Sequence, residues 1–446
     1  MKQNLESSSS SHIISIMQKY FNYFVIFLSL NFLFCTQVLS ANCTDVSGST
    51  ATFSTSCTDL DIDGDGSNVT INSGVTIDGT SDAVGFANAT NTTLTNNGTI
   101  SSSGSRGLRT TTSATINDLS NNGTISAGGS SGIRNDGTIT TLTNTNTISA
   151  TGGYGIYNIT GATIGTITNS GTISAGTSFG LRNNGAAIIN TLTNSGTISA
   201  DQSGLWNGGT ITTLTNTSNI KALDGEFGLK NVKGTIGTLT NSGTISASGN
   251  YGLFNDQNST STAIITTLIN SGTISAGSNS GLWNDGTITT LTNTDTGNIK
   301  ALDGNFGLKN VNGTIGTLTN SGTISASGNY GLYNDGTATI TTLTNTGTIS
   351  ASGNSIGIYN DTDSTITTLN NSQGASSSAL TYDAKLPTNY NVIVNSTSDF
   401  GKTTFSNASG TTNFGVHSTS TLAASTTYSS VLSGLSSSDI ASGTSG

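Results

Sequence analysis

One repeated motif, Gly-Leu-x-Asn with Ile in place of Leu in some copies, places an aromatic or basic residue at its third position. The residues at this position are Arg109, Arg134, Tyr157, Arg182, Trp206, Lys230, Phe254, Trp283, Lys309, Tyr333 and Tyr359. Exposed rings and guanidinium groups suit the faces of sugar rings or the polar surface of a partner. Both Trp of the chain fall in this row. We therefore expect the row to be a contact surface, possible partners being a glycan or the surface of a host or neighbouring cell, with Trp206 and Trp283 as anchors. The alternative is that the rings stack on one another and stiffen the fold.

The residues that catalysis would need are sparse. The two histidines are His12 and His417, and no Gly-x-Ser-x-Gly motif that could hold a nucleophile lies near either of them. The sequence also lacks Cys and His clusters with metal-ligand spacing, a phosphate loop and a dinucleotide fingerprint. We expect no enzyme activity, no metal and no cofactor.

Carboxylates need a separate check, because some parallel β-helix proteins degrade polysaccharides with Asp residues. Asp224 and Asp303 are duplicates of each other, and Asp256 and Asp335 occupy equivalent repeat positions. An active site is a local departure from a repeat, whereas these acids follow it. A binding or structural role is therefore favoured, and a polysaccharide-degrading enzyme is the alternative.

An acidic segment, Asp61-Ile-Asp63-Gly-Asp65-Gly66, matches the first half of a calcium-binding loop. The twelfth position of such a loop would be Asn72, where the loop needs Glu. An acidic turn is favoured over a calcium site.

The motif belongs to a repeat that occupies most of the chain. Units of about 25 residues begin at Leu94, Leu119, Leu142, Ile167, Leu192, Leu214, Leu239, Leu268, Leu291, Leu318 and Leu343, with a truncated unit at Leu369. A fixed period of this size is typical of a solenoid. Two stretches of three units, 192–267 and 268–342, match unit for unit. A block was duplicated, so any function of this region should be repetitive.

The residues between the apolar rows exclude helical repeats. Gly and Asn interrupt every window in which a helix could start, and Glu occurs only at Glu6 and Glu226. Triplets such as Thr-Ile-Ser alternate polar and apolar residues, as half-buried strands do. Three turns divide each unit into three short strands, which would stack on the next unit at roughly 4.8 Å. The sequence predicts an all-β parallel β-helix of about 11 coils.

Strand alternation predicts which side chains face the core. The Leu of Gly-Leu-x-Asn should point inward and the next residue outward. Residues two before the Leu, such as Tyr154, Phe179, Tyr251 and Tyr330, should then face the core.

Two rows of Asn recur once per unit. One runs from Asn96 to Asn371, and the other follows Gly-Leu-x from Asn135 to Asn360, with Thr110 as its exception. Asn tolerates the left-handed conformation of a corner, and identical amides one coil apart can hydrogen-bond along the stack. We favour two amide ladders, because simple turn formers would vary among Asn, Asp and Gly.

Composition and charge exclude some partners. The net charge is −10, and 13 Lys and Arg in 446 residues make no basic patch, so nucleic acid is not an expected partner. Outward Thr-x-Thr pairs would suit an ice-binding solenoid, but Gly165, Gly237 and Gly316 interrupt them. Solvated strand Thr is the favoured interpretation, and ice binding is a less favoured alternative.

The N-terminus is typical of an export signal. Lys19 precedes an apolar stretch from Tyr20 to Phe34 that is too short for a spanning helix. We expect cleavage after Ser40, with Met17 as an alternative start, and no membrane span in the mature chain. The cysteines that remain, Cys43 and Cys57, are expected to form a disulfide after export.

The expected domains follow from where the period holds. Residues 1–40 form the signal peptide, 41–93 an N-terminal β cap and 94–371 the β-helix repeats. Residues 372–432 form a C-terminal β cap or linker, and 433–446 a flexible Ser/Gly tail.

The export signal, the off-period cap and the Leu-Thr-Asn-Ser-Gly-Thr-Ile-Ser repeats together resemble the passenger domain of a bacterial autotransporter (type V secretion). The resemblance covers about 42–440. It implies a right-handed parallel β-helix displayed on, or released from, the outer membrane surface, where such a protein acts as an adhesin. It also implies a C-terminal membrane β-barrel for export, which this sequence does not contain. Residues 379–431 resemble the segment that joins passenger to barrel, which favours truncation.

Overall fold

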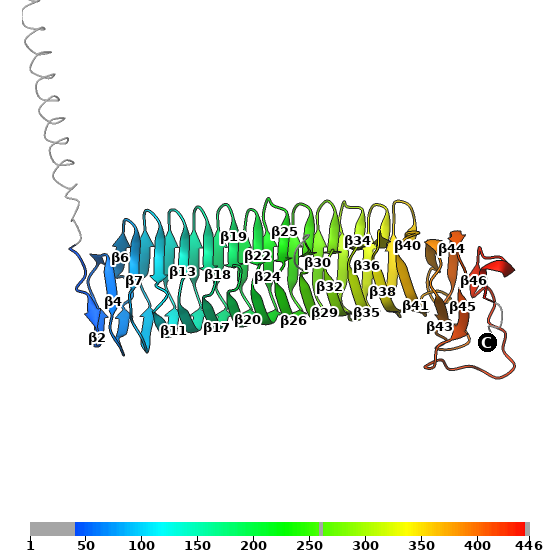
Figure 1. Cartoon of the computed structure of the whole chain (residues 1–446), viewed down its shortest axis with the longest axis horizontal. Coiled ribbons are helices and arrows are strands. Elements are labelled where there is room, and N and C mark those ends of the chain that lie inside the picture. Colours follow the sequence, from blue (N-terminus) through cyan, green and yellow to red (C-terminus); the bar gives the residue numbers. More distant parts are fainter. Residues whose placement is uncertain (1–40, 258–261, 442–446) are drawn as a thin grey trace, which may run out of the picture. The chain divides into compact units, whose positions relative to one another are not determined.

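The structure is a computed structural model that describes residues 41–257 and 262–441. Almost all of these residues belong to one compact unit, Asn42–Gly446, in which coils stack along one axis (Figure 1). Each repeat unit contributes one strand to each of three parallel sheets. The predicted all-β parallel β-helix is confirmed. The predicted signal peptide, its cleavage site and the alternative start at Met17 lie outside the described residues.

The 13-stranded sheet is built from the Thr-Ile-Ser-Ala segments. Their Thr and Ser side chains are mostly half-buried on the outer face, whereas Ile and Ala fill the core. Its strands are β3 (Cys57–Thr58), β6 (Thr76–Gly79), β9 (Thr99–Ser102), β12 (Thr124–Ala127), β15 (Thr147–Ala150), β18 (Thr172–Ala175), β21 (Thr197–Ala200), β24 (Asn219–Ala222), β27 (Thr244–Ala247), β30 (Thr273–Ala276), β33 (Asn298–Ala301), β36 (Thr323–Ala326) and β39 (Thr348–Ala351).

The 16-stranded sheet is built from segments such as Thr-Ile-Thr-Thr-Leu-Thr-Asn, in which Ile, Leu and Asn are buried. Its strands are β2 (Thr50–Phe53), β5 (Asn68–Ile71), β8 (Thr92–Asn96), β11 (Thr115–Asn121), β14 (Thr138–Asn144), β17 (Thr163–Asn169), β20 (Ile188–Asn194), β23 (Thr210–Asn216), β26 (Thr235–Asn241), β29 (Ile264–Asn270), β32 (Thr287–Asn293), β35 (Thr314–Asn320), β38 (Thr339–Asn345), β41 (Thr365–Asn371), β43 (Asn389–Val392) and β45 (Asn413–Val416).

The 17-stranded sheet carries the Gly-Leu-x-Asn motif. Its strands are β1 (Val46–Ser47), β4 (Leu60–Asp63), β7 (Asp82–Phe86), β10 (Arg106–Thr110), β13 (Ser131–Asn135), β16 (Tyr154–Asn158), β19 (Phe179–Asn183), β22 (Ser203–Asn207), β25 (Phe227–Val232), β28 (Tyr251–Asp256), β31 (Ser280–Asn284), β34 (Phe306–Val311), β37 (Tyr330–Asp335), β40 (Ile356–Asn360), β42 (Leu380–Lys385), β44 (Thr403–Ser409) and β46 (Leu432–Ser433).

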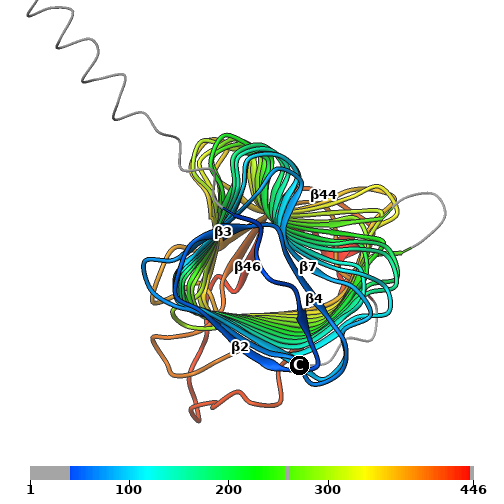
Figure 2. The same ribbon diagram turned by 90° about the vertical axis from the view of Figure 1, so that its left-hand side faces the viewer.

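The strand register places identical or similar residues of successive coils opposite one another. Ile148 of β15 lies opposite Ile173 of β18, and Leu142 of β14 lies opposite Ile167 of β17. Every Ile and Leu of the repeat rows is buried, and together they form one continuous core. In the end view the three sheets surround this core (Figure 2). Apolar burial therefore continues from coil to coil, although each coil contributes few apolar side chains.

The sheets extend beyond the regular repeats. On the N-terminal side β4 pairs with β7 and β7 with β10, and on the C-terminal side β40 pairs with β42 and β42 with β44. The coils therefore outnumber the eleven expected. The C-terminal coils have larger core residues, including the fully buried Tyr382 and Tyr390. A short 3-10 helix, η1 (Ser437–Asp439), follows, and Ile440 bridges to Thr412.

Both predicted Asn ladders are present. In each, the side-chain Nδ2 of one coil donates to the Oδ1 of the next coil, at 2.7 to 3.1 Å. The first ladder runs from Asn96 to Asn371, and the second from Asn135 to Asn360, where the Thr110 hydroxyl begins it by donating to Asn135. The ladder amides are completely buried. Buried amides need partners, and here each coil supplies the partner of the next.

The expected reason for these Asn residues was partly wrong. No ladder Asn has a positive φ, whereas Asn88, Asn91 and Asn312 in the turns do. Ladder residues are in strands or at strand ends, and their Nδ2 atoms also donate to turn carbonyls, as Asn241 does to Gly243. Hydrogen bonding therefore accounts for the ladder Asn, and left-handed conformation does not.

Two further observations concern a disulfide and membrane-spanning helices. Cys43 and Cys57 form a disulfide beside β3. Across the described residues, no helix is both long enough and apolar enough to cross a membrane.

Candidate binding surface

The aromatic and basic row lies on the outer face of the 17-stranded sheet. Neighbouring strands place its members opposite one another, as with Trp206 and Lys230, and with Phe254 and Trp283. All of these side chains are half-buried, so each keeps part of its surface in solvent. This row, from Arg109 to Tyr359, is called the contact stripe.

A second row of residues lies beside the stripe, at positions that we expected to face the core. Tyr154, Phe179, Tyr251 and Tyr330 are half-buried on the outer face, so the expectation that they face the core was wrong. This companion row consists of Arg106, Ser131, Tyr154, Phe179, Ser203, Phe227, Tyr251, Ser280, Phe306, Tyr330 and Ile356.

The reason is a break in strand alternation at the Gly of the motif. A Cβ added to Gly155 would lie 2.8 Å from Cγ2 of the core residue Ile173, so Gly155 faces inward. Ile156, which follows it, is also buried. Because Gly155 and Ile156 both point inward, the alternation of the strand is broken and the preceding Tyr154 points outward. The recurring Gly was the available signal, because a strand interior that admits no side chain marks a close approach.

Near the middle of the stripe, rings from both rows and one arginine form a cluster. Tyr154 and Tyr157 have ring centroids 4.6 Å apart, and Phe179 stacks on Trp206 at 6.0 Å. The Arg182 guanidinium lies over the Trp206 ring at 4.8 Å and also contacts the other three rings. The positive charge of Arg182 is therefore held over aromatic faces.

The next coils repeat the arrangement with lysines. Lys230 Nζ lies 4.3 Å from the Phe227 ring centroid, and Lys309 Nζ lies 4.0 Å from that of Trp283. The Trp283 ring also contacts Phe254, with centroids 5.2 Å apart. Beyond Lys309, further rings continue the surface through the contact between Tyr333 and Tyr359 at 5.2 Å. Every coil of the stripe thus presents either a ring or a cation, from Arg109 to Tyr359.

The duplicated blocks differ at one position beside the tryptophans. In the first block a Cβ on Gly208 would lie 2.5 Å from Cη2 of Trp206, so the indole covers that glycine. In the second block Asp285 stands at the equivalent position after Trp283. In both blocks the companion residue is a fully buried serine, Ser203 or Ser280, whose small side chain leaves room for the indole.

Carboxylates balance the cations of the stripe. Arg109 and Arg134 both pair with Asp136, at 3.1 and 2.5 Å, and Lys230 pairs with Asp256 at 3.1 Å. Further carboxylates follow the stripe residue by two positions at Asp285, Asp335 and Asp361. The surface therefore combines aromatic faces with paired charges and has no excess of positive charge.

The surroundings of Asp285 shift its pKa. Burial and, to a smaller extent, the neighbouring Asp256 carboxylate raise this pKa to about 6, while Lys309 opposes the shift. Burial also lowers the pKa of Lys309. Ionised Asp285 is thus disfavoured in the folded state.

This perturbation predicts a pH-dependent effect of Asp285→Asn. Because the folded pKa lies above the ordinary value of 3.8, ionisation destabilises the fold as pH rises from about 4 to about 6. The variant should be more stable than the parent above pH 7, by about 1 kcal/mol after allowance for solvent screening, and equal to it below pH 3.5. Thermal melting across pH measures this. Asp303→Asn, in an exposed turn, is the control; an equal gain in both variants at all pH values would contradict the assignment.

The other candidates for chemistry are weak. The ring Nδ1 of His417 lies 2.8 Å from the Thr419 hydroxyl on the surface. Asp65 accepts hydrogen bonds from Thr90 and Asn91. Within the described ranges, no group of three or more His, Cys, Asp or Glu side chains could hold a metal ion.

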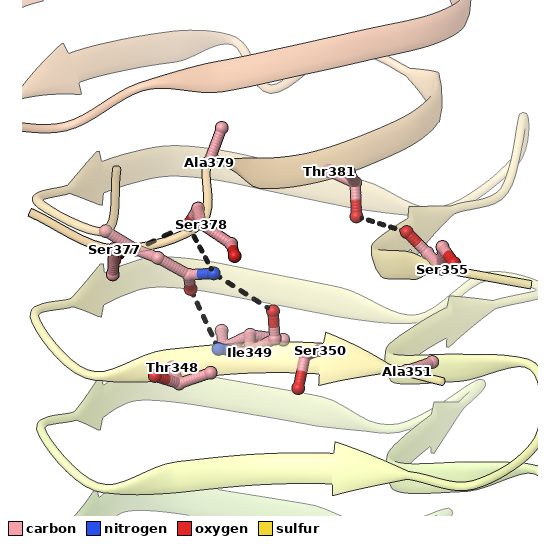
Figure 3. Close-up of a pocket in the computed structure, with 10 residues that line it drawn as sticks. Thr348, Ile349, Ser350, Ala351, Ser355, Ser377, Ser378, Ala379 and Thr381 are labelled. Carbon is pink, nitrogen blue, oxygen red and sulfur yellow. Dashed lines mark hydrogen bonds between the residues drawn. The ribbon is translucent and has the colours of Figure 1, made fainter. Parts of the chain in front are cut away.

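A cavity of about 480 Å³ lies where the 13-stranded sheet ends, beside β39 (Figure 3). With no following strand, β39 leaves Ile349 facing the cavity, and the Gln373 side chain accepts from its N–H at 2.8 Å and donates to its C=O at 3.4 Å. Thr381 donates to the Ser355 carbonyl across the same space. The lining side chains are Ser, Thr, Ala, Ile and Gln, and none of them is an acidic or basic group.

Comparisons with known protein families, with curated proteins and with solved structures found no match to this chain.

Proposed function

We propose that this protein is a secreted or surface-displayed binding protein that acts in adhesion, and that the contact stripe holds its ligand, a glycan on a partner surface. The observation that carries the proposal is the unbroken series of half-exposed rings and cations along one sheet face, from Tyr157 to Tyr359. Aromatic faces at fixed spacing suit a ligand that itself repeats.

The location is proposed from the chain's own sequence. The predicted export signal and the resemblance to an autotransporter passenger support a location outside the cell for the mature protein. The disulfide between Cys43 and Cys57 suits an oxidising compartment. Binding is proposed in preference to catalysis because Asp256 and Asp335, two of the acids beside the stripe, occupy equivalent positions of the repeat.

The double variant Trp206→Ser, Trp283→Ser tests the stripe. Central aromatic anchors commonly contribute at least 2 kcal/mol each to binding, so adhesion to cells or to a glycan array should fall by more than tenfold. The core rows are untouched, so the melting temperature should change by only a few degrees.

The matched control is Ile188→Ser, Ile264→Ser. These residues are apolar positions on the outer face of the 16-stranded sheet, one exposed and one half-buried. The control should retain adhesion. A lowered melting temperature with adhesion retained in the Trp variant would instead assign these rings a structural role.

A further inference from the structure

The spacing of the rings along the axis limits the shape of a ligand that could use them all. Centroids of rings on adjacent coils lie 5.2 Å apart for Phe254 and Trp283, and 5.2 Å for Tyr333 and Tyr359. In the companion row, Phe227 and Tyr251 lie 5.5 Å apart. Successive pyranose rings in an extended polysaccharide advance by a similar distance. A straight sugar chain parallel to the axis could therefore meet each coil with one sugar.

The charges of the surface exclude a polyanion as the best ligand. Arg109, Arg134 and Lys230 have carboxylate partners, and Arg182 and Lys309 are held over rings. The whole chain carries a net charge of −10, so its long-range field opposes the approach of a sulfated or uronic acid polymer. The surface instead suits an uncharged ligand.

Hydrogen-bonding groups beside the rings suit hydroxyl groups. Asp256, Asp335 and Asp361 lie two positions after stripe residues, and the Tyr359 hydroxyl donates to Asp361 at 3.4 Å. Carboxylates accept strong hydrogen bonds from hydroxyl donors, while aromatic faces cover the apolar faces of sugar rings. This pairing of apolar face and polar flank recurs in several coils of the stripe.

We propose that the ligand is an uncharged, extended polysaccharide that lies along the solenoid axis over the contact stripe, one sugar per coil from Tyr157 to Tyr359. This rests on the proposed function, because it assigns the ligand of the same stripe. Affinity should rise with the length of the sugar chain, since each added sugar reaches a further coil, until the stripe is covered.

The experiment uses β-1,4-linked chitin and cellulose oligosaccharides of two to eight sugars, with heparin and polygalacturonate as polyanions. Both Trp of the chain lie in the stripe, so their fluorescence reports occupancy directly. We expect the octamer to bind at least about tenfold more tightly than the dimer, a gain of about 1.4 kcal/mol. Binding should change little between low and high salt, because neither charge release nor screening contributes.

Single variants test where the sugar chain lies on the protein. Trp206 and Trp283 lie three coils apart, so an octamer reaches both and a trimer does not. Trp206→Ser and Trp283→Ser should each weaken octamer binding, and the control Ile188→Ser should not.

Several results would overturn the inference. Equal affinity for dimer and octamer would exclude an axial chain, and tighter, salt-sensitive binding of heparin or polygalacturonate would exclude an uncharged ligand. Both outcomes leave the adhesive function in place if the double Trp variant loses cell adhesion. If no oligosaccharide bound and adhesion still depended on Trp206 and Trp283, this inference would be wrong and the proposed function would remain. Adhesion that is independent of both Trp residues would remove the proposed function itself.

Discussion

Ile245→Asp should disrupt the solenoid in the middle of its stack. Ile245 is fully buried and lies between Ile220 and Ile274 in a column of identical side chains. A carboxylate there has no partner, and an uncompensated buried charge costs about 3 to 5 kcal/mol. Each coil contacts only its neighbours, so the loss falls on the contacts that join the two halves of the stack. Ile198→Asp, two coils earlier, should have the same effect. The β-sheet signal in the circular dichroism spectrum should decrease, and the melting temperature should fall.

The control for this prediction is Ser246→Lys on the same strand. Lys221 occupies the equivalent outward position one coil earlier, so the lysine side chain already fits there. The control should melt like the parent. If Ile245→Asp also melted like the parent, the inward assignment of its row would be wrong.

Asn241→Asp should have a comparably large effect without changing the size of the side chain. Asn241 Nδ2 donates to Asn270 Oδ1 at 2.8 Å and to the carbonyls of Gly243 and Thr273 at 3.2 and 3.1 Å. A carboxylate cannot donate, so it loses these bonds and sets an oxygen against three other oxygens. The expected cost is about 3 to 5 kcal/mol at neutral pH. Protonation restores one donor, so the melting deficit should shrink as the pH is lowered.

Asn305→Asp is the matched control, because Asn305 lies in an exposed turn. It introduces the same charge and should change the melting temperature little at any pH. A neutral effect of Asn241→Asp would show that the amide ladder contributes nothing to stability.

The sequence predicts the regular coils well because single residue types repeat at fixed positions. The Ile and Leu rows, the three strands of each coil and both amide ladders follow from such repetition, and the structure confirms them. The outward direction of the stripe residues, such as Trp206, follows from the alternation that begins at the buried Leu205.

Local geometry that depends on how the backbone packs was harder to predict from the sequence. The companion row faces outward because Gly155 and its equivalents turn inward, which simple alternation does not anticipate. The continuation of the sheets into 46–90 and 380–433 was hidden because different residues, such as Val69 and Tyr390, fill the core positions there. Whether the stripe binds a ligand stays a prediction.

The direction of the amide ladders has a consequence for how such a chain can change its length. Every ladder Asn presents an oxygen to the coil before it and an N–H to the coil after it, as Asn216 and Asn241 do. Any whole number of coils therefore begins with an acceptor and ends with a donor. A block can be copied and inserted without leaving a buried amide unpaired, as the duplication of 192–267 into 268–342 illustrates. Genetic gain or loss of coils should thus change the reach of this protein in whole-coil steps while leaving its stability per coil unchanged.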